Sequence, residues 1–270
     1  MATSAGSSTP ERERGGSGVR CELDASGAVA SVTLDRPEVL NAQTPHTWVA
    51  LREVSRNLPG TVRVVIVRGA GRAFSAGLDR RMFTPEGVPG EGSFTDLLAD
   101  PEPDTTMAGY QEAFRWLRRP DLISVAAVQG HAIGAGFQLA LACDLRILTE
   151  DAQLCMAETG LGLVPDLTGT KPLVELVGYA RALEICVTSR RVSAAEAARI
   201  GLANLVVPAD HLDGAVADLV AALLAAPRDA VVETKALLAG AAGRDLDAQC
   251  AAERAAQLRR LRDLAHMADG

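Results

Sequence analysis

The sequence predicts an α/β fold, and two patterns carry that prediction. In the first two thirds of the chain, apolar runs of strand length alternate with amphipathic stretches of helix length, which is typical of sheets covered by helices. From Thr170 onward the pattern changes to helical segments rich in alanine and leucine. Since the chain has 270 residues, of which 48% are hydrophobic, it is long enough to bury a sizeable core.

Each element is expected from a local pattern. Apolar runs predict strands at 28–34, 62–68, 122–130 and 145–149. The amphipathic stretch 44–58 predicts the helix of a βαβ crossover between the first two strands, and a further helix is expected at about 134–143. Later helices are expected at 171–177, 180–187, 194–200, 211–224, 230–238 and 246–264, with "LANLVV" (202–207) among them as an edge strand.

Three regions are expected along the chain: a disordered tail at 1–18, an α/β core at 19–200 and a C-terminal helical oligomerisation region at 201–270. The tail is small, polar and charged. In the last region Leu258, Leu261 and Leu264 form an apolar stripe suited to packing on another subunit. The stretch 83–106, rich in proline, glycine and acid, is expected as a mobile loop over a site or as a plain surface insertion.

Composition and charge exclude several classes of protein. The chain has 27 basic and 34 acidic residues and no basic block longer than a pair, so no nucleic-acid partner is expected. Its five cysteines and four histidines lack the spacing of metal ligands, which predicts reduced thiols and no metal site. We find neither an export signal nor an apolar run long enough to span a bilayer, and therefore expect no membrane partner and a cytoplasmic location.

Two turns built of small residues follow predicted strands: "GRAFSAGLD" (71–79) and "GHAIGAGFQLALACD" (130–144). Glycine and alanine let a ligand approach the backbone closely, and N–H groups at a helix N-terminus carry partial positive charge. Two such N–H groups that converge on one oxygen would form an oxyanion hole. Alternatively, the small residues only allow helix and strand to pack tightly. The sequence contains no dinucleotide, P-loop or nucleophile-elbow motif.

Five segments in order resemble the enoyl-CoA hydratase/isomerase (crotonase) superfamily, from Val19 to the C-terminus: "LDRPEVLNA", "GRAFSAGLD", "AVQGHAIGAGFQLALACDLRI", "AETGLGLVPDLTGTKPL" and "SAAEAARIGLANLVVP". The resemblance implies a spiral of ββα units with a C-terminal helical region that builds homotrimers or hexamers. It also implies an acyl-CoA thioester substrate and no separate cofactor, because coenzyme A is part of that substrate.

The same resemblance implies the binding residues. The two oxyanion N–H groups match Leu78 and Ala135, and backbone near Asn41 and Ala42 is expected to contact the adenine of coenzyme A. Positions 39 and 40, often basic in the family, are Val and Leu here. The candidates for the phosphate contacts are therefore Arg36, Arg80, Arg81 and Lys235, each of which is otherwise a solvated surface charge.

The acid and base residues decide the expected chemistry. The two glutamates of the family's hydratases match Gln138 and Glu158. A side-chain amide does not act as a general acid or base in the working pH range. Losing one general acid or base costs about a hundred- to ten-thousandfold in rate. Efficient hydration is therefore not expected, whereas Glu158 suffices to move a double bond by taking a proton and returning it two carbons along.

Asp166 is a further candidate for proton transfer. It follows Glu158 by eight positions (166 − 158 = 8), and an aspartate at the matching place transfers protons in isomerase subgroups of the family. Its alternative role is the N-cap of a helix beginning near 168–171. The leading hypothesis is thus an isomerase that uses Glu158, with or without Asp166, and Gln138 as a neutral positioner. The alternatives are a hydratase in which Gln138 positions water, and a non-catalytic acyl-CoA binding protein.

Three polar residues near the two turns are expected to be structural. Asp144 lies toward the far end of its helix, away from the oxyanion donor. His131 is expected to be bonded to backbone in its turn. Asp79 is expected to cap the segment that follows it.

Overall fold

The computed structural model describes residues 17–91, 93, 95–96 and 99–268. The predicted tail therefore lies outside the described residues, except for its last two positions. In the described part of the chain, no helix is both long enough and apolar enough to cross a membrane. No cluster of three or more His, Cys, Asp or Glu side chains that could hold a metal ion occurs there either.

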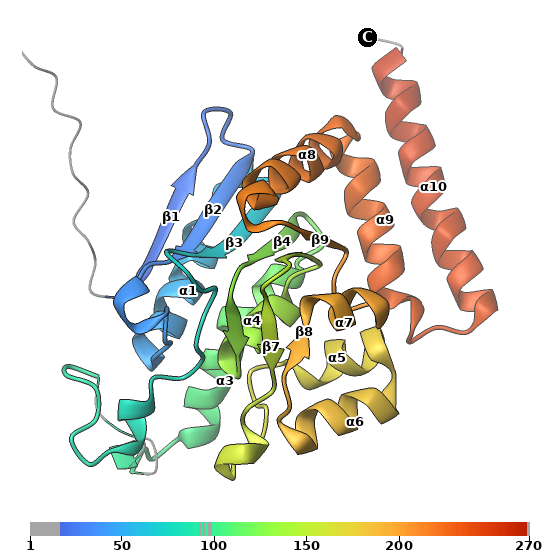
Figure 1. Ribbon diagram of the computed structural model, residues 1–270. Coiled ribbons are helices and arrows are strands. Elements are labelled where there is room, and N and C mark those ends of the chain that lie inside the picture. The colour runs from blue at the N-terminus through green and yellow to red at the C-terminus, as the bar shows by residue number, and fades with distance from the viewer. Residues whose placement is uncertain (1–16, 92, 94, 97–98, 269–270) are drawn as a thin grey trace, which may run out of the picture.

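The strands form two sheets (Figure 1). The larger sheet has the order β1 (Val19–Leu23), β2 (Val29–Leu34), β3 (Val64–Gly69), β4 (Ile123–Val128), β6 (Leu145–Thr149), β9 (Leu205–Val207). Its strands are parallel except for β1, which is antiparallel to β2. The smaller sheet has the order β5 (His131–Ile133), β7 (Gln153–Cys155), β8 (Val192–Ser193).

The four strands predicted at 28–34, 62–68, 122–130 and 145–149 are β2, β3, β4 and β6, and β9 is the predicted edge strand. The prediction missed β1 and the three strands of the smaller sheet. Those three have two or three residues each, too few for a hydrophobic period to show.

Helix α1 (Pro45–Asn57) joins β2 to β3, which are parallel, so the predicted βαβ crossover is confirmed. Its start is fixed by Thr44, whose side chain forms a capping box with Thr47, and by Pro45 at the first helical position. Further along, β4 and β5 precede α4 (Ala135–Ala142), and β6 and β7 precede α5 (Thr170–Val177). Each pair places one strand in each sheet before its helix, which is the predicted spiral of ββα units.

The C-terminal helices confirm the predicted segments, with ends shifted by a few residues: α5, α6 (Tyr179–Thr188), α7 (Ala194–Arg199), α8 (Leu212–Ala225), α9 (Arg228–Ala241) and α10 (Leu246–Ala268). Helix α3 (Pro103–Arg115) was not predicted, so the expectation of a loop to residue 106 is wrong for its last four residues. Pro103 at the helix start and Asp104 in its first turn favour a helix there, and the helix buries Ala113 and Phe114.

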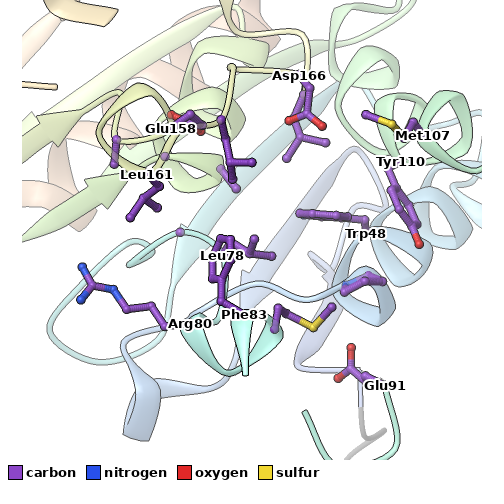
Figure 2. A pocket seen from close by; sticks show the side chains of 18 of the residues that line it. Trp48, Leu78, Arg80, Phe83, Glu91, Met107, Tyr110, Glu158, Leu161 and Asp166 are labelled. Atoms are coloured by element: carbon purple, nitrogen blue, oxygen red, sulfur yellow. The ribbon is translucent and has the colours of Figure 1, made fainter. Parts of the chain in front are cut away.

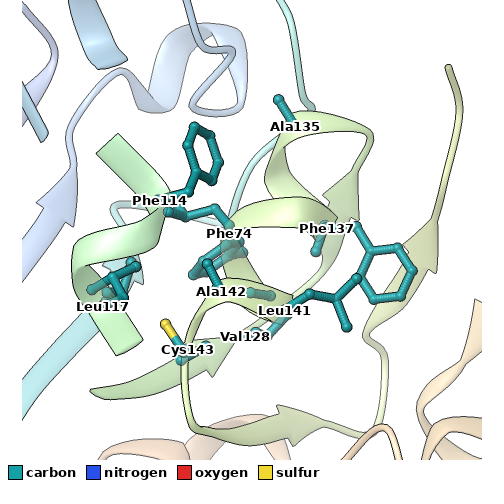
Figure 3. Packing of buried hydrophobic residues seen from close by; sticks show 14 of the residues in the cluster. Phe74, Phe114, Leu117, Val128, Ala135, Phe137, Leu141, Ala142 and Cys143 are labelled. Atoms are coloured by element: carbon teal, nitrogen blue, oxygen red, sulfur yellow. The ribbon is translucent and has the colours of Figure 1, made fainter. Parts of the chain in front are cut away.

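Helices cover both faces of the larger sheet. On one face α1, α3 and α4 enclose the main core, in which Phe74, Phe114 and Phe137 are fully buried (Figure 3). On the other face α8 packs on the sheet through Leu212, Val216 and Val220. Both β9 and α8 are thus part of the sheet layer although they follow residue 200. The boundary expected at residue 200, between the α/β core and the C-terminal helical region, stays a prediction.

Helices α9 and α10 lie side by side, with α10 on the side away from the two sheets (Figure 1). Helix α9 has no buried residue, and Ala256 is the one described residue of α10 that is buried. The predicted stripe of Leu258, Leu261 and Leu264 is about half exposed, at 51%, 50% and 54%. These two helices therefore present apolar surface that nothing in the described chain covers.

Candidate active site

A pocket of about 620 Å³ opens where the turn after β3 meets the end of β5, and its lining includes residues 76–78 and 133–135 (Figure 2). Residues of α1, α3, the 80–83 turn and the segment 157–167 line it. Most of the lining is apolar, including Trp48, Leu78, Met82, Phe83, Met107, Tyr110, Leu161, Leu163, Val164 and Leu167. Five of the predicted site residues also line the pocket, namely Leu78, Arg80, Ala135, Glu158 and Asp166.

The two turns of small residues pack backbone against backbone at the pocket wall. Ser75 N–H donates to the His131 carbonyl at 2.8 Å, and Ile133 N–H donates to the Ser75 carbonyl at 3.0 Å. Gly77 has a φ of +86°, and a Cβ there would lie 2.4 Å from the Ile133 carbonyl oxygen. Glycine is therefore required at position 77 for the turns to meet.

The backbone N–H groups of Leu78 and Ala135 come from these two turns. Ala135 is the first residue of α4, so its N–H lies at a helix N-terminus and has no intrahelical acceptor. Within the described chain, neither N–H group donates a hydrogen bond. Both residues line the same pocket, where their N–H groups are available to an oxygen of a bound ligand.

Gln138 is in the first turn of α4 and is completely buried. Its Nε2 donates to Oε1 of Glu158 at 2.7 Å. Its Oε1 accepts from the backbone N–H of Leu167 at 2.9 Å and of Gly169 at 3.2 Å. Gln138 is not among the described lining residues of the pocket, so it lies behind Glu158 instead of facing a ligand.

Glu158 is 8% exposed, and its Oε2 is buried without a hydrogen-bond partner in the described chain. Burial is the main cause that raises the pKa of Glu158, and the nearby charge of Asp166 raises it further, while the bond from Gln138 opposes the rise. Burial also raises the pKa of Asp166. Raised pKa values bring both carboxyls closer to the range in which a group can take up and release protons.

Asp166 lies on the same side of the pocket as Glu158, across from Leu78 (Figure 2). The side-chain amide of Gln111 in α3 donates to the Asp166 backbone carbonyl at 2.8 Å. The alternative role of Asp166 as a helix cap is wrong, because Gly169 is the N-cap residue of α5 and no side chain caps that helix. Its side chain lines the pocket instead (Figure 2).

The structure does not bring Asn41 and Ala42 to the described pocket lining. Asn41 has a left-handed φ of 55°, and its side chain organises the turn. The amide donates to the carbonyls of Ala70 and Ala73, both at 2.8 Å, and its oxygen accepts from Arg36 N–H at 2.9 Å. The role of these two residues in binding adenine stays a prediction.

The basic candidates also have internal partners. Arg36 and Arg81 both pair with Asp79, at 3.2 and 2.7 Å, and neither is among the described lining residues. The Arg81 guanidinium is the main cause that lowers the pKa of Asp79. Asp79 caps the 80–83 turn by accepting from Arg81 N–H, as predicted. Arg80 lines the pocket.

Lys235 lies in α9, away from the described pocket lining. Its ammonium donates to the carboxylate of Asp144 and to the Leu122 carbonyl, both at 2.7 Å. Asp144 also accepts from Ser124, which confirms its structural role. His131 lies in β5, and its buried Nδ1 has no partner in the described chain, so this nitrogen does not form the expected bond to backbone.

Sequence reasoning missed the aromatic wall of the pocket. Trp48 and Tyr110 line it with ring centroids 4.9 Å apart, and the Trp48 indole N–H donates to Gln43 Oε1 at 2.9 Å. Trp48 falls in a helix that was predicted, but Tyr110 falls in α3, which was not. No local motif links the two side chains, because the pairing depends on how α1 and α3 pack.

Comparison with known proteins agrees with this fold and site. A family model described as enoyl-CoA hydratase/isomerase matches residues 24–266. A solved Thermobifida fusca structure, named as a "putative enoyl-CoA hydratase" in complex with acetoacetyl-CoA, is 53% identical with a TM-score of 0.88 and covers 92% of this chain and 96% of that chain. The chain therefore belongs to the enoyl-CoA hydratase/isomerase family, and its fold is the crotonase fold.

The names of curated relatives include both "enoyl-CoA hydratase/isomerase" and "enoyl-CoA hydratase". A Bacillus subtilis protein named "Putative enoyl-CoA hydratase/isomerase YhaR" is 34% identical over 241 residues, which is 88% of this chain and 90% of the relative. The short-chain-enoyl-CoA hydratase of Clostridium acetobutylicum is 34% identical over 197 residues, which is 70% of this chain and 69% of the relative. These names support a family enzyme and do not distinguish hydration from isomerisation.

Proposed function

We propose that this protein is an acyl-CoA double-bond isomerase. The observation that carries the proposal is the pairing of one buried carboxylate, Glu158, with a neutral amide, Gln138, behind it. Such a site holds a base that can exchange protons, but no second carboxyl at position 138 to act on water. Binding of an acyl-CoA is supported by the Thermobifida fusca relative, whose structures carry acetoacetyl-CoA and CoA.

The proposed reaction converts a 3-enoyl-CoA into a 2-enoyl-CoA. Glu158 takes a proton from C2, the carbon beside the thioester carbonyl. The C2–H electrons form a C1–C2 double bond and the carbonyl π electrons move to the oxygen, which gives a dienolate whose negative oxygen the N–H groups of Leu78 and Ala135 stabilise. The thioester carbonyl then re-forms, the C1–C2 π electrons become the C2–C3 double bond, and the C3–C4 π electrons bind the proton at C4, which comes from Glu158 or through Asp166. No water is consumed and no atom is lost.

The second candidate function is hydration of a 2-enoyl-CoA, which the hydratase names of relatives favour. The version in which Gln138 positions the water is weakened because its oxygen and one amide hydrogen are already bonded. Hydration would then depend on Glu158 and Asp166. A protein that binds acyl-CoA without turnover is the third candidate.

The test is a mass-resolved assay of matched 2-enoyl-CoA and 3-enoyl-CoA substrates in D₂O. We expect the 3-enoyl-CoA to become the 2-enoyl-CoA with no gain of water, and Glu158→Gln to stop the reaction. Glu150→Gln, at an exposed position outside the described lining, is the matched control and keeps wild-type activity. Faster addition of water than isomerisation would show a hydratase, and binding without deuterium exchange at C2 would show the non-catalytic protein.

The homo-oligomer of three or six chains expected from the sequence is part of this proposal. It is supported by the exposed leucines of α10.

A further inference from the structure

We propose that Gln138 is a positioning residue that assigns Oε2 of Glu158 as the proton-carrying oxygen and fixes the Asp166 segment relative to it. The inference rests on the proposed function, since it concerns the same proton transfer. It starts from the three hydrogen bonds of the buried Gln138 amide, to Glu158, Leu167 and Gly169.

The orientation of the Gln138 amide is determined by its surroundings. The backbone N–H groups of Leu167 and Gly169 are donors, so the group that faces them must be the amide oxygen. The NH₂ group is then left to face Oε1 of Glu158. If the amide group were rotated by 180°, its NH₂ group would face the two backbone N–H donors. Its oxygen would then face Oε1 of Glu158, which is also an acceptor.

This orientation makes the two oxygens of Glu158 different. Oε1 accepts the Gln138 bond, which stabilises negative charge on it and lowers its affinity for a proton. Oε2 is buried without a partner in the described chain. A proton taken from the substrate therefore resides on Oε2. Glycine at position 134 leaves room for this placement of the Glu158 carboxyl, because a Cβ there would lie 3.2 Å from Oε1.

The same amide holds the segment that carries the second carboxyl. Leu167 directly follows Asp166, and Thr168 between the two bonded N–H groups has a left-handed φ of 71°. The backbone at Gly169 comes so close that a Cβ there would lie 2.7 Å from Cγ of Gln138. One side chain of α4 thus sets the positions of Glu158 and of the backbone beside Asp166.

An amide performs this role over a wider pH range than a carboxyl. An ionised glutamate at position 138 would place a second negative oxygen 2.7 Å from Oε1 of Glu158, and two carboxylates that close share one proton. A protonated glutamate, however, reproduces the pattern of Gln138, with its carbonyl toward the two N–H groups and its O–H toward Glu158. Glutamine keeps the donor when the pH rises.

The experiment compares wild type, Gln138→Glu and Gln138→Leu by the pH dependence of kcat and KM for isomerisation. For wild type we expect kcat to rise with pH and then level off as Glu158 ionises. Gln138→Glu should approach wild-type kcat at low pH and lose it at higher pH, where the shared proton is released. Gln138→Leu should lose about a hundredfold in kcat at every pH, the usual cost of a catalytic group misplaced by about 1 Å. KM should change little, because the described pocket lining is intact.

Gln257→Glu adds the same charge at an exposed position of α10 and is expected to keep the wild-type profile. Identical pH profiles for Gln138→Glu and wild type would overturn the inference, as would wild-type kcat in Gln138→Leu. If Gln138→Leu does not fold, the Gln138→Glu profile decides. Failure of the proposed function appears in the wild type instead, as hydration or no turnover. If the wild type hydrates, the same pH profiles are recorded for hydration. If it shows no turnover, the pH dependence of CoA-ester binding is measured, and binding by Gln138→Glu that does not change with pH would overturn the inference.

Discussion

At the scale of single residues, the two pocket carboxyls influence each other. The Asp166 charge contributes to the raised pKa of Glu158, after burial. Asp166→Asn should therefore lower the pKa of Glu158 and move the acid limb of kcat/KM to lower pH. Because burial remains, the limb should stay above the ordinary value of 4.5.

This shift is measured from the pH dependence of isomerisation, or of deuterium exchange at C2. Asp247→Asn, which removes an exposed carboxylate of α10, is the control and should leave the limb in place. A limb that moves to higher pH in Asp166→Asn would contradict the coupling of the two groups.

The raised pKa of Glu158 also has a consequence for stability. The folded protein holds this proton more tightly than the unfolded chain, so stability falls as pH rises from about 4.5 through the raised folded-state pKa. Glu158→Gln removes the buried charge and should raise the Tm at pH 7, with a gain that shrinks toward pH 4.5. Scanning calorimetry of both proteins across this pH range checks it, and a lower Tm of the variant at pH 7 would speak against it.

The sequence predicted five of the residues that line the pocket, because each lies in or directly after a short segment whose order along the chain is distinctive. It predicted that Gln138 is a neutral positioner. It did not predict the hydrogen-bond partners of the Gln138 oxygen, because Leu167 and Gly169 lie 29 and 31 positions further on. Likewise, the sequence suggested Arg36 as a free cation, but Asp79, 43 positions away, engages its charge. Side-chain pairing over such separations is determined by the packed fold.

At the scale of elements, the contact between the two turns should be sensitive to one methyl group. Gly77→Ala places a Cβ at 2.4 Å from the Ile133 carbonyl oxygen, at a φ of +86°. The turns must separate, which displaces the Leu78 N–H. We expect kcat to fall by about a hundred- to a thousandfold, the cost of one oxyanion-hole donor. Gly214→Ala in α8 is the matched control, because a Cβ there meets nothing within 4 Å.

The control should be neutral, or more stable by up to about 1 kcal/mol, because alanine favours a helix. Steady-state kinetics and Tm are measured for both variants. Full activity in Gly77→Ala would show that the packing of the turns does not position the donor.

Elements were predicted well where the hydrophobic period is long enough to recognise. The four longer parallel strands and the six late helices are examples. The strands of the smaller sheet were missed because their two or three residues carry no period. Helix α3 was missed because its first turn lies in a stretch rich in proline and acid, which also suits a loop.

At the scale of the whole molecule, the exposed apolar stripe of α10 predicts self-association. Leu258, Leu261 and Leu264 recur every three residues and are each about half exposed. We expect the wild type to be a trimer or a hexamer. The double variant Leu258→Glu/Leu261→Glu should dissociate, because charges replace the apolar contact. Light scattering coupled to size exclusion gives the masses, and Gln257→Glu on the same helix is the control. A wild-type monomer at micromolar concentration would refute the prediction.

The order of strands in the larger sheet has a consequence for synthesis. From β1 to β9 the strands lie in the order in which the ribosome makes them. Each new strand therefore finds its neighbour already emerged, and the nascent sheet can grow in one direction from its N-terminal edge. Until residues 205–207 have left the exit tunnel, β6 presents an unpaired edge. A translation product that stops before β9 would therefore be prone to edge-to-edge aggregation.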